Sequence, residues 1–172
     1  MGIAWMMLSI AAPAGADASA FDSAGYRIAH YRAPTRRAPN GVTRIAPQAA
    51  AVLRPGVDAL FIDVTPVDPG TGGKPERMTI PGAHWFPESG RGGIDPAVER
   101  WLLDGVTRLT TGRADMPVVV FCLADCWMSW NAARRLQRAG YRPIWWLAEG
   151  SDGWRDLGLR LEPVSPERNR PE

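Results

Sequence analysis

The chain has 172 residues, 45% of them apolar and 22% charged, which is the ordinary composition of a globular protein with about one domain. Twenty basic and 18 acidic residues leave a formal net charge of +2, so there is no electrostatic case for a nucleic-acid partner. After the first 20 residues, no apolar run reaches the length of about 18 residues that spans a membrane.

The first 20 residues have the pattern of a secretory signal peptide. Ile3–Ala12 is apolar except for Ser9, and Ala-x-Ala patterns follow, although no Lys or Arg precedes the apolar stretch. We expect cleavage after Ala16, Ala18 or Ala20. A buried N-terminal helix is the alternative. Export would place the two cysteines of the mature chain in an oxidising compartment.

The rest of the chain predicts one α/β domain over residues 42–162, between an extension at 21–41 and a flexible tail at 163–172. In the extension, Tyr26–Tyr31 alternates weakly, as a strand at a sheet edge would. Strands are expected at 42–45, 60–64, 83–86, 117–122 and 144–147, and helices at 47–53, 96–109 and 128–139. Residues 66–81 are predicted to be loop, and 150–154 a closing turn or short helix. This alternation favours a mostly parallel sheet with helices on both faces.

Ligands of parallel sheets bind at the carboxyl ends of the strands, which here are Asp63 and Cys122. Cys122 ends the strongest predicted strand, and a helix begins about six residues later. We expect the amides of this connection to surround the Cys122 sulfur, lower its pKa and make it a nucleophile. Asp125 opposes this effect, and the loop holds no Lys or Arg to offset it. The residues predicted to form the loop and its cradle are Leu123, Ala124, Asp125, Trp127, Met128 and Ser129.

Cys126 is the candidate resolving thiol. Three other interpretations of the two cysteines stay open: a small buried apolar residue, a structural disulfide, and half of a zinc site. Zinc is disfavoured because the chain has only two cysteines, and His30 and His84 show no ligand spacing; we therefore expect no metal. A disulfide across so small a loop adds little stability and is more often labile, which favours chemistry.

The remaining candidates are supporting residues. Asp63 is expected to hold the loop or an Arg side chain. Trp127 and Trp130 bracket the loop and suggest a docking surface or apolar lid, with core packing as the alternative. Ser129 and Asn131 are interpreted as helix caps, with binding of the loop backbone as the alternative.

These motifs resemble a known family. The order of Asp63, Ile80-Pro-Gly-Ala-His84, the strand ending at Cys122, and Glu149-Gly-Ser-Asp-Gly-Trp154 is similar to a rhodanese domain, whose catalytic cysteine falls on Cys122 and carries a persulfide. The segment Cys122–Asn131 with Glu149–Trp154 resembles the exported CXXCW motif proteins associated with PQQ-dependent catabolism.

The resemblance implies a five-stranded rhodanese-like fold, a periplasmic location, and a PQQ dehydrogenase or c-type cytochrome as the exported partner. It implies no bound cofactor, only a transient persulfide. The family's loop arginine, which binds an anionic sulfur donor, is absent here. Position 128 is Met where a phosphatase relative has Arg, so phosphatase activity is excluded.

We therefore expect sulfur transfer or thiol–disulfide exchange, with Cys122 as nucleophile and Cys126 as resolving thiol. The alternative is a non-enzymatic periplasmic binding or assembly factor with a structural Cys122–Cys126 disulfide.

Overall fold

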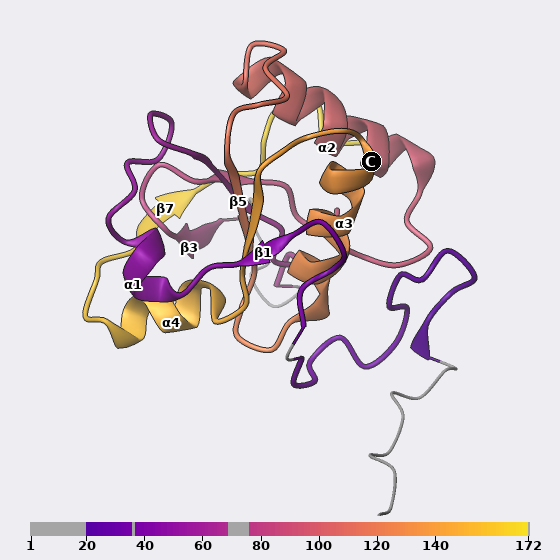
Figure 1. The fold of residues 1–172 in the computed structure, drawn as a ribbon, viewed down its shortest axis with the longest axis horizontal. Coiled ribbons are helices and arrows are strands. Elements are labelled where there is room, and N and C mark those ends of the chain that lie inside the picture. The colour runs from indigo at the N-terminus through magenta and orange to yellow at the C-terminus, as the bar shows by residue number, and fades with distance from the viewer. Residues whose placement is uncertain (1–19, 36, 69–75, 172) are drawn as a thin grey trace, which may run out of the picture.

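The computed structural model describes residues 20–35, 37–68 and 76–171. A five-stranded parallel sheet lies at its centre, in the order β1-β6-β5-β2-β4 (Figure 1). The strands are β1 (Thr43–Arg44), β2 (Leu60–Asp63), β4 (His84–Trp85), β5 (Val118–Phe121) and β6 (Ile144–Leu147). The helices are α1 (Pro47–Ala50), α2 (Pro96–Leu109), α3 (Trp127–Arg138) and α4 (Gly150–Asp156). The fold class predicted from the sequence is confirmed.

Strand residues alternate between two cores, because successive side chains of a strand point to opposite faces of the sheet. Val118, Val120 and Cys122 face the core that α2 and α3 cover. Val119 and Phe121 face the core that α1 and α4 cover. Burial on both faces explains why β2 and β5 are continuous apolar runs. The same alternation directs the Cys122 side chain toward α3.

The C-terminal segment differs most from expectation. Residues 66–81, predicted to be loop, contain β3 (Arg77–Thr79). It pairs antiparallel with β7 (Glu162–Val164), at the start of the segment predicted to be a flexible tail. Beyond β7, Glu167 binds Nδ1 of His84 at 2.7 Å and Nη2 of Arg108 at 2.5 Å. These long-range pairings hold the segment on the domain and have no local sequence signal.

The extension also differs from expectation, since Tyr26–Tyr31 does not join the central sheet. We call residues 20–35 and 37–41 the N-terminal arm. The arm, coloured indigo to purple in Figure 1, runs beside α3. It forms only isolated β-bridges, and one of them joins Arg32 to Cys126.

The predicted signal peptide lies outside the described residues, apart from Ala20. None of the helices in the described part of the chain is long and apolar enough to cross a membrane.

Candidate functional site

The two cysteines meet where β5 ends and α3 begins. Their sulfur atoms lie 2.9 Å apart, and both thiols are free. A disulfide bond measures about 2.05 Å, so the two sulfurs must approach by about 1 Å for the pair to be oxidised. The loop between them turns at Asp125, whose φ of 54° is left-handed, and the amide of Cys126 closes the turn on the carbonyl of Leu123 at 3.3 Å.

The Cys122 sulfur is not reachable by solvent, so that part of the expectation is wrong. Cys122 is 0% exposed and packs in the core beneath α3. Among the described residues, its sulfur contacts the Thr65 hydroxyl at 3.5 Å and the Cys126 sulfur. Burial is the main reason that the pKa of Cys122 is raised well above its ordinary value, and the neighbouring Cys126 adds to this. Cys122 is therefore held as a neutral thiol.

The backbone amides expected to act on Cys122 favour the thiolate of Cys126 instead. Cys126 is the N-cap residue of α3, and although its side chain makes no capping hydrogen bond, the backbone of Met128 and Leu123 helps to lower the pKa of its thiol. The hydrogen bond from the Cys122 thiol, more than any other contact, lowers the pKa of Cys126 from about 9 to about 7, against the opposing effect of burial. The two amides and the charge of Arg32 lower it further. Near neutral pH, the negative charge of the pair therefore resides on Cys126.

The wall behind Cys122 is a buried polar network centred on Asp63. One carboxylate oxygen of Asp63 accepts from the amide and hydroxyl of Thr65, at 2.8 and 2.6 Å. The other accepts from Arg77 and from the hydroxyl of Thr79. Arg77 also donates to the Ser151 hydroxyl at 2.9 Å, which ties β3 to the start of α4. Asp63 thus holds an Arg side chain, one of the two roles considered for it. No sequence pattern pointed to Thr65 or Arg77 as its partners.

The loop is held from the α4 side. The amide of Ser151 donates to the Cys122 carbonyl at 2.9 Å, and Asp152 accepts from the amide of Ala124 at 2.9 Å. Glycine at position 150 lets the start of α4 lie close to the loop, because a Cβ there would lie 2.1 Å from the Cys122 carbonyl oxygen. The Gly-Ser-Asp sequence therefore positions the backbone of the loop and does not face its sulfurs.

Neither Ser129 nor Asn131 caps α3, and Ser129 takes the alternative role of binding the backbone of the loop. The Ser129 hydroxyl donates to the Cys126 carbonyl at 2.9 Å and accepts from the indole of Trp146 at 3.0 Å. The buried side chain of Asn131 binds both backbone groups of Arg27 and also the carbonyl of Gly90. Asn131 therefore attaches the N-terminal arm to α3.

Trp127 and Trp130 lie beneath the arm. The Trp127 indole donates to the Ala33 carbonyl and the Trp130 indole to the Arg37 carbonyl, each at 2.9 Å. The guanidinium of Arg27 stacks 4.6 Å from the centre of the Trp127 ring. In this position the two rings bind a segment of the same chain, and both remain partly exposed.

A cavity of about 280 Å³ lies at the same edge of the sheet, and Leu123 contributes to its wall. Neither cysteine lines it. The residues that bring charge or an aromatic ring to it include Asp68, Glu76, Arg77, Trp85 and Arg155. No group of three or more His, Cys, Asp or Glu side chains that could hold a metal occurs among the described residues.

A cysteine at the end of a central parallel strand, followed by a tight loop and a helix, is the arrangement that the sequence resemblance implies. Residues 49–157 match the rhodanese-like domain family. The chain belongs to this family. The match covers both cysteines, Asp63 and α4, and excludes the whole N-terminal arm.

One solved structure that is similar to this rhodanese-like chain is the solution structure of the 30 kDa polysulfide-sulfur transferase homodimer from Wolinella succinogenes. It has 18% sequence identity and a TM-score of 0.48, and the alignment covers 77% of this chain and 84% of that one. No curated protein gives a significant match to this chain.

Proposed function

We propose that this rhodanese-like protein transfers sulfur or exchanges disulfides through the Cys122–Cys126 pair, with Cys126 as the attacking thiolate and Cys122 as the resolving thiol. The observation that carries the proposal is the 2.9 Å contact between a fully buried sulfur and one at the N-terminus of α3. The roles are the reverse of those expected from the sequence, because hydrogen-bond donors and access both favour Cys126.

The first step is attack by the Cys126 thiolate on one sulfur of a persulfide or disulfide. A new S–S bond forms on Cys126, and the other sulfur of the donor leaves as a thiolate. In the second step Cys122 loses its proton and attacks the Cys126 sulfur. The group that Cys126 had taken up then leaves, as hydrogen sulfide from a persulfide or as a thiol from a mixed disulfide.

The pair ends as a disulfide that has lost two electrons, and the donor sulfur has gained them. A dithiol reductant from outside the chain must return the pair to the reduced state before another turnover. The buried position of Cys122 suits the second step, because the raised pKa of its thiol keeps it from competing with Cys126 for the donor.

The proposal includes export and a role beside PQQ-dependent alcohol oxidation. Supporting it are the apolar Ile3–Ala12 stretch with its Ala-x-Ala sites, and the resemblance of Cys122–Asn131 to the CXXCW motif proteins. In this chain three residues, not two, separate the cysteines. The partner in this proposal is a PQQ dehydrogenase or c-type cytochrome in the periplasm, and no cofactor is bound.

Intact-mass analysis with a small persulfide donor tests the assignment of roles. Cys122→Ser, which lacks the resolving thiol, should gain about 32 Da, one sulfur atom, and peptide mapping should place the gain on Cys126. Cys126→Ser should stay unmodified, because its remaining thiol is buried. The wild-type protein should release hydrogen sulfide and end as the internal disulfide.

Thermal unfolding of both variants serves as the control for folding. An adduct on Cys122 in Cys126→Ser, with none on Cys126 in Cys122→Ser, would reverse the roles. If neither folded variant forms an adduct, the transfer proposal fails and a structural disulfide becomes the better interpretation.

A further inference from the structure

The loop around Cys126 presents an electrostatic problem. Asp125 is exposed beside Cys126, and a neighbouring carboxylate disfavours a thiolate. Residues 122–131 contain no Lys or Arg that could compensate. A positive charge near Cys126 must therefore come from another part of the chain.

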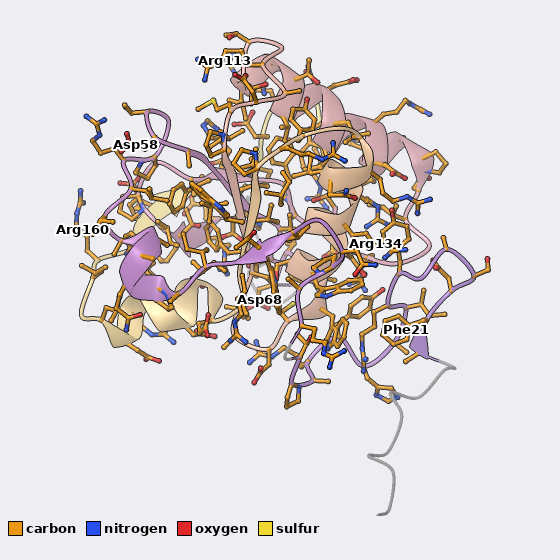
Figure 2. All side chains as sticks on the ribbon, viewed as in Figure 1. Phe21, Asp58, Asp68, Arg113, Arg134 and Arg160 are labelled. Atoms are coloured by element: carbon orange, nitrogen blue, oxygen red, sulfur yellow. The ribbon has the colours of Figure 1, made fainter. Side chains whose placement is uncertain are left out.

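The N-terminal arm brings such a charge to the loop. The amide of Trp127 donates to the Tyr31 carbonyl at 2.8 Å, and the amide of Ala33 donates to the Asp125 carbonyl at 3.0 Å. These two bonds flank Arg32 and Cys126, which form an isolated antiparallel bridge. Figure 2 labels Phe21 in the arm and Arg134 in α3, whose side chain donates to the carbonyl of Ala24 in the arm.

The two backbone hydrogen bonds determine on which side of the Arg32–Cys126 bridge the Arg32 side chain lies. Two residues flanked in this way are a non-hydrogen-bonded pair, whose Cα atoms lie about 4.5 Å apart and whose side chains leave the same face of the ladder. Arg32 is exposed and Cys126 is 4% exposed, so the Arg32 side chain starts beside Cys126 and extends into solvent. Its charge also contributes to the lowered pKa of Cys126.

We propose that Arg32 is part of the active site: it stabilises the Cys126 thiolate and attracts sulfur substrates that carry a negative charge beside the reacting sulfur. This inference rests on the proposed function, since it takes Cys126 as the attacking thiolate. Because the family match begins at residue 49, Arg32 comes from outside the matched domain. Asn131 and Trp127 hold the arm in place, so they position Arg32 and do not themselves act on substrate.

Alkylation of the reduced full-length protein with two reagents of similar size tests the charge directly. Iodoacetate is an anion and iodoacetamide is neutral, so the ratio of their rates at Cys126 reports the local potential. Arg32→Gln should lower this ratio about fivefold, which is the effect of a unit charge a few ångströms away at partial exposure. Added salt should lower the ratio in the wild-type protein and change it little in Arg32→Gln.

Two matched variants separate charge from structure. Arg32→Lys keeps the charge and should keep most of the ratio. Arg37→Gln removes another exposed arginine of the arm, whose carbonyl binds Trp130, and should leave the ratio unchanged. Peptide mapping confirms that the alkylated residue is Cys126.

The outcomes distinguish the two proposals. If Cys126 is alkylated but Arg32→Gln has the wild-type ratio, the role of Arg32 is refuted and the proposed function stands. If Cys126 in the reduced wild-type protein reacts with neither reagent across the neutral pH range, its role as attacking thiolate is refuted, and that of Arg32 with it.

Discussion

Asn131 provides the sharpest test of how the N-terminal arm is attached. Its side chain is 0% exposed, accepts from the Arg27 amide at 3.0 Å, and donates to the carbonyls of Arg27 and Gly90, each at 2.9 Å. Asn131→Ala removes all three bonds and leaves three backbone groups without their partner. At about 1 kcal/mol for each bond, the expected loss of unfolding free energy is about 3 kcal/mol.

Urea unfolding followed by tryptophan fluorescence measures this loss. A domain of this size has a stability of about 5–15 kcal/mol, so the variant should remain folded. Gln137→Ala is the matched control, because it removes an amide from the same helix that makes no side-chain hydrogen bond among the described residues and should cost less than about 0.5 kcal/mol. Asn131→Ala should also speed the proteolysis of the arm and lower the ratio of iodoacetate to iodoacetamide rates at Cys126, because Arg32 is no longer held beside the sulfur.

The reasoning fails if Asn131→Ala is as stable as Gln137→Ala and its arm is cleaved no faster. That result would mean that water replaces the three bonds at no cost, and that Asn131 does not hold the arm on α3.

Three further predictions concern the loop and the tail. The pKa of Cys126 is about 7 in the folded chain and about 9 in the unfolded one, so the reduced protein should gain stability as pH rises from about 7 to about 9 and lose that gain as pH falls. Cys126→Ser should lack this dependence in urea titrations. Gly150→Ala should cost more than about 2 kcal/mol and slow the Cys126 reaction, because φ there is +57° and the new Cβ would meet the Cys122 carbonyl. Glu167→Gln should cost about 1 kcal/mol by urea unfolding at pH 6. The pKa of Glu167 is lowered from 4.5 to about 2, so stability in the wild type should fall as pH drops across that range, and the variant should not show this fall.

The sequence predicted the central sheet because each of its main strands has a local signal. Residues 60–64 and 117–122 are apolar runs, and Asp95 caps α2 through the Ala97 amide as expected. The strands β3 and β7 have three residues each and mixed polarity, and only their pairing with each other makes them strands. The position of the arm was equally hidden, since it depends on contacts such as Arg27 with Asn131 across 104 positions of sequence.

At the site, the sequence identified the two cysteines, and the function proposed here assigns their roles in the reverse order. The strand-end rule located Cys122 correctly. The alternation of side chains along the strand could also have been used. Cys122 follows Val118 and Val120 at intervals of two, so its side chain lies on the face of the sheet that α2 and α3 cover. The helix predicted at 128–139 begins one residue earlier, at Trp127, and this start makes Cys126 the N-cap residue, where the hydrogen bond from Cys122 and the nearby backbone lower the pKa of its thiol.

These contacts also locate the boundary of the functional unit. The part of the chain that matches the family begins at residue 49 and includes both sulfurs, yet the backbone of Tyr31 and Ala33 pairs with the loop that contains Cys126. A fragment that starts at residue 42 would keep the sheet and its four helices, but Trp127 would lose its acceptor Ala33 and Asn131 would keep only its bond to Gly90. It would also lack Arg32 and expose Cys126 beside Asp125. The fold can be complete in such a fragment while the reactivity of its thiol changes, so the minimal active chain must include the arm.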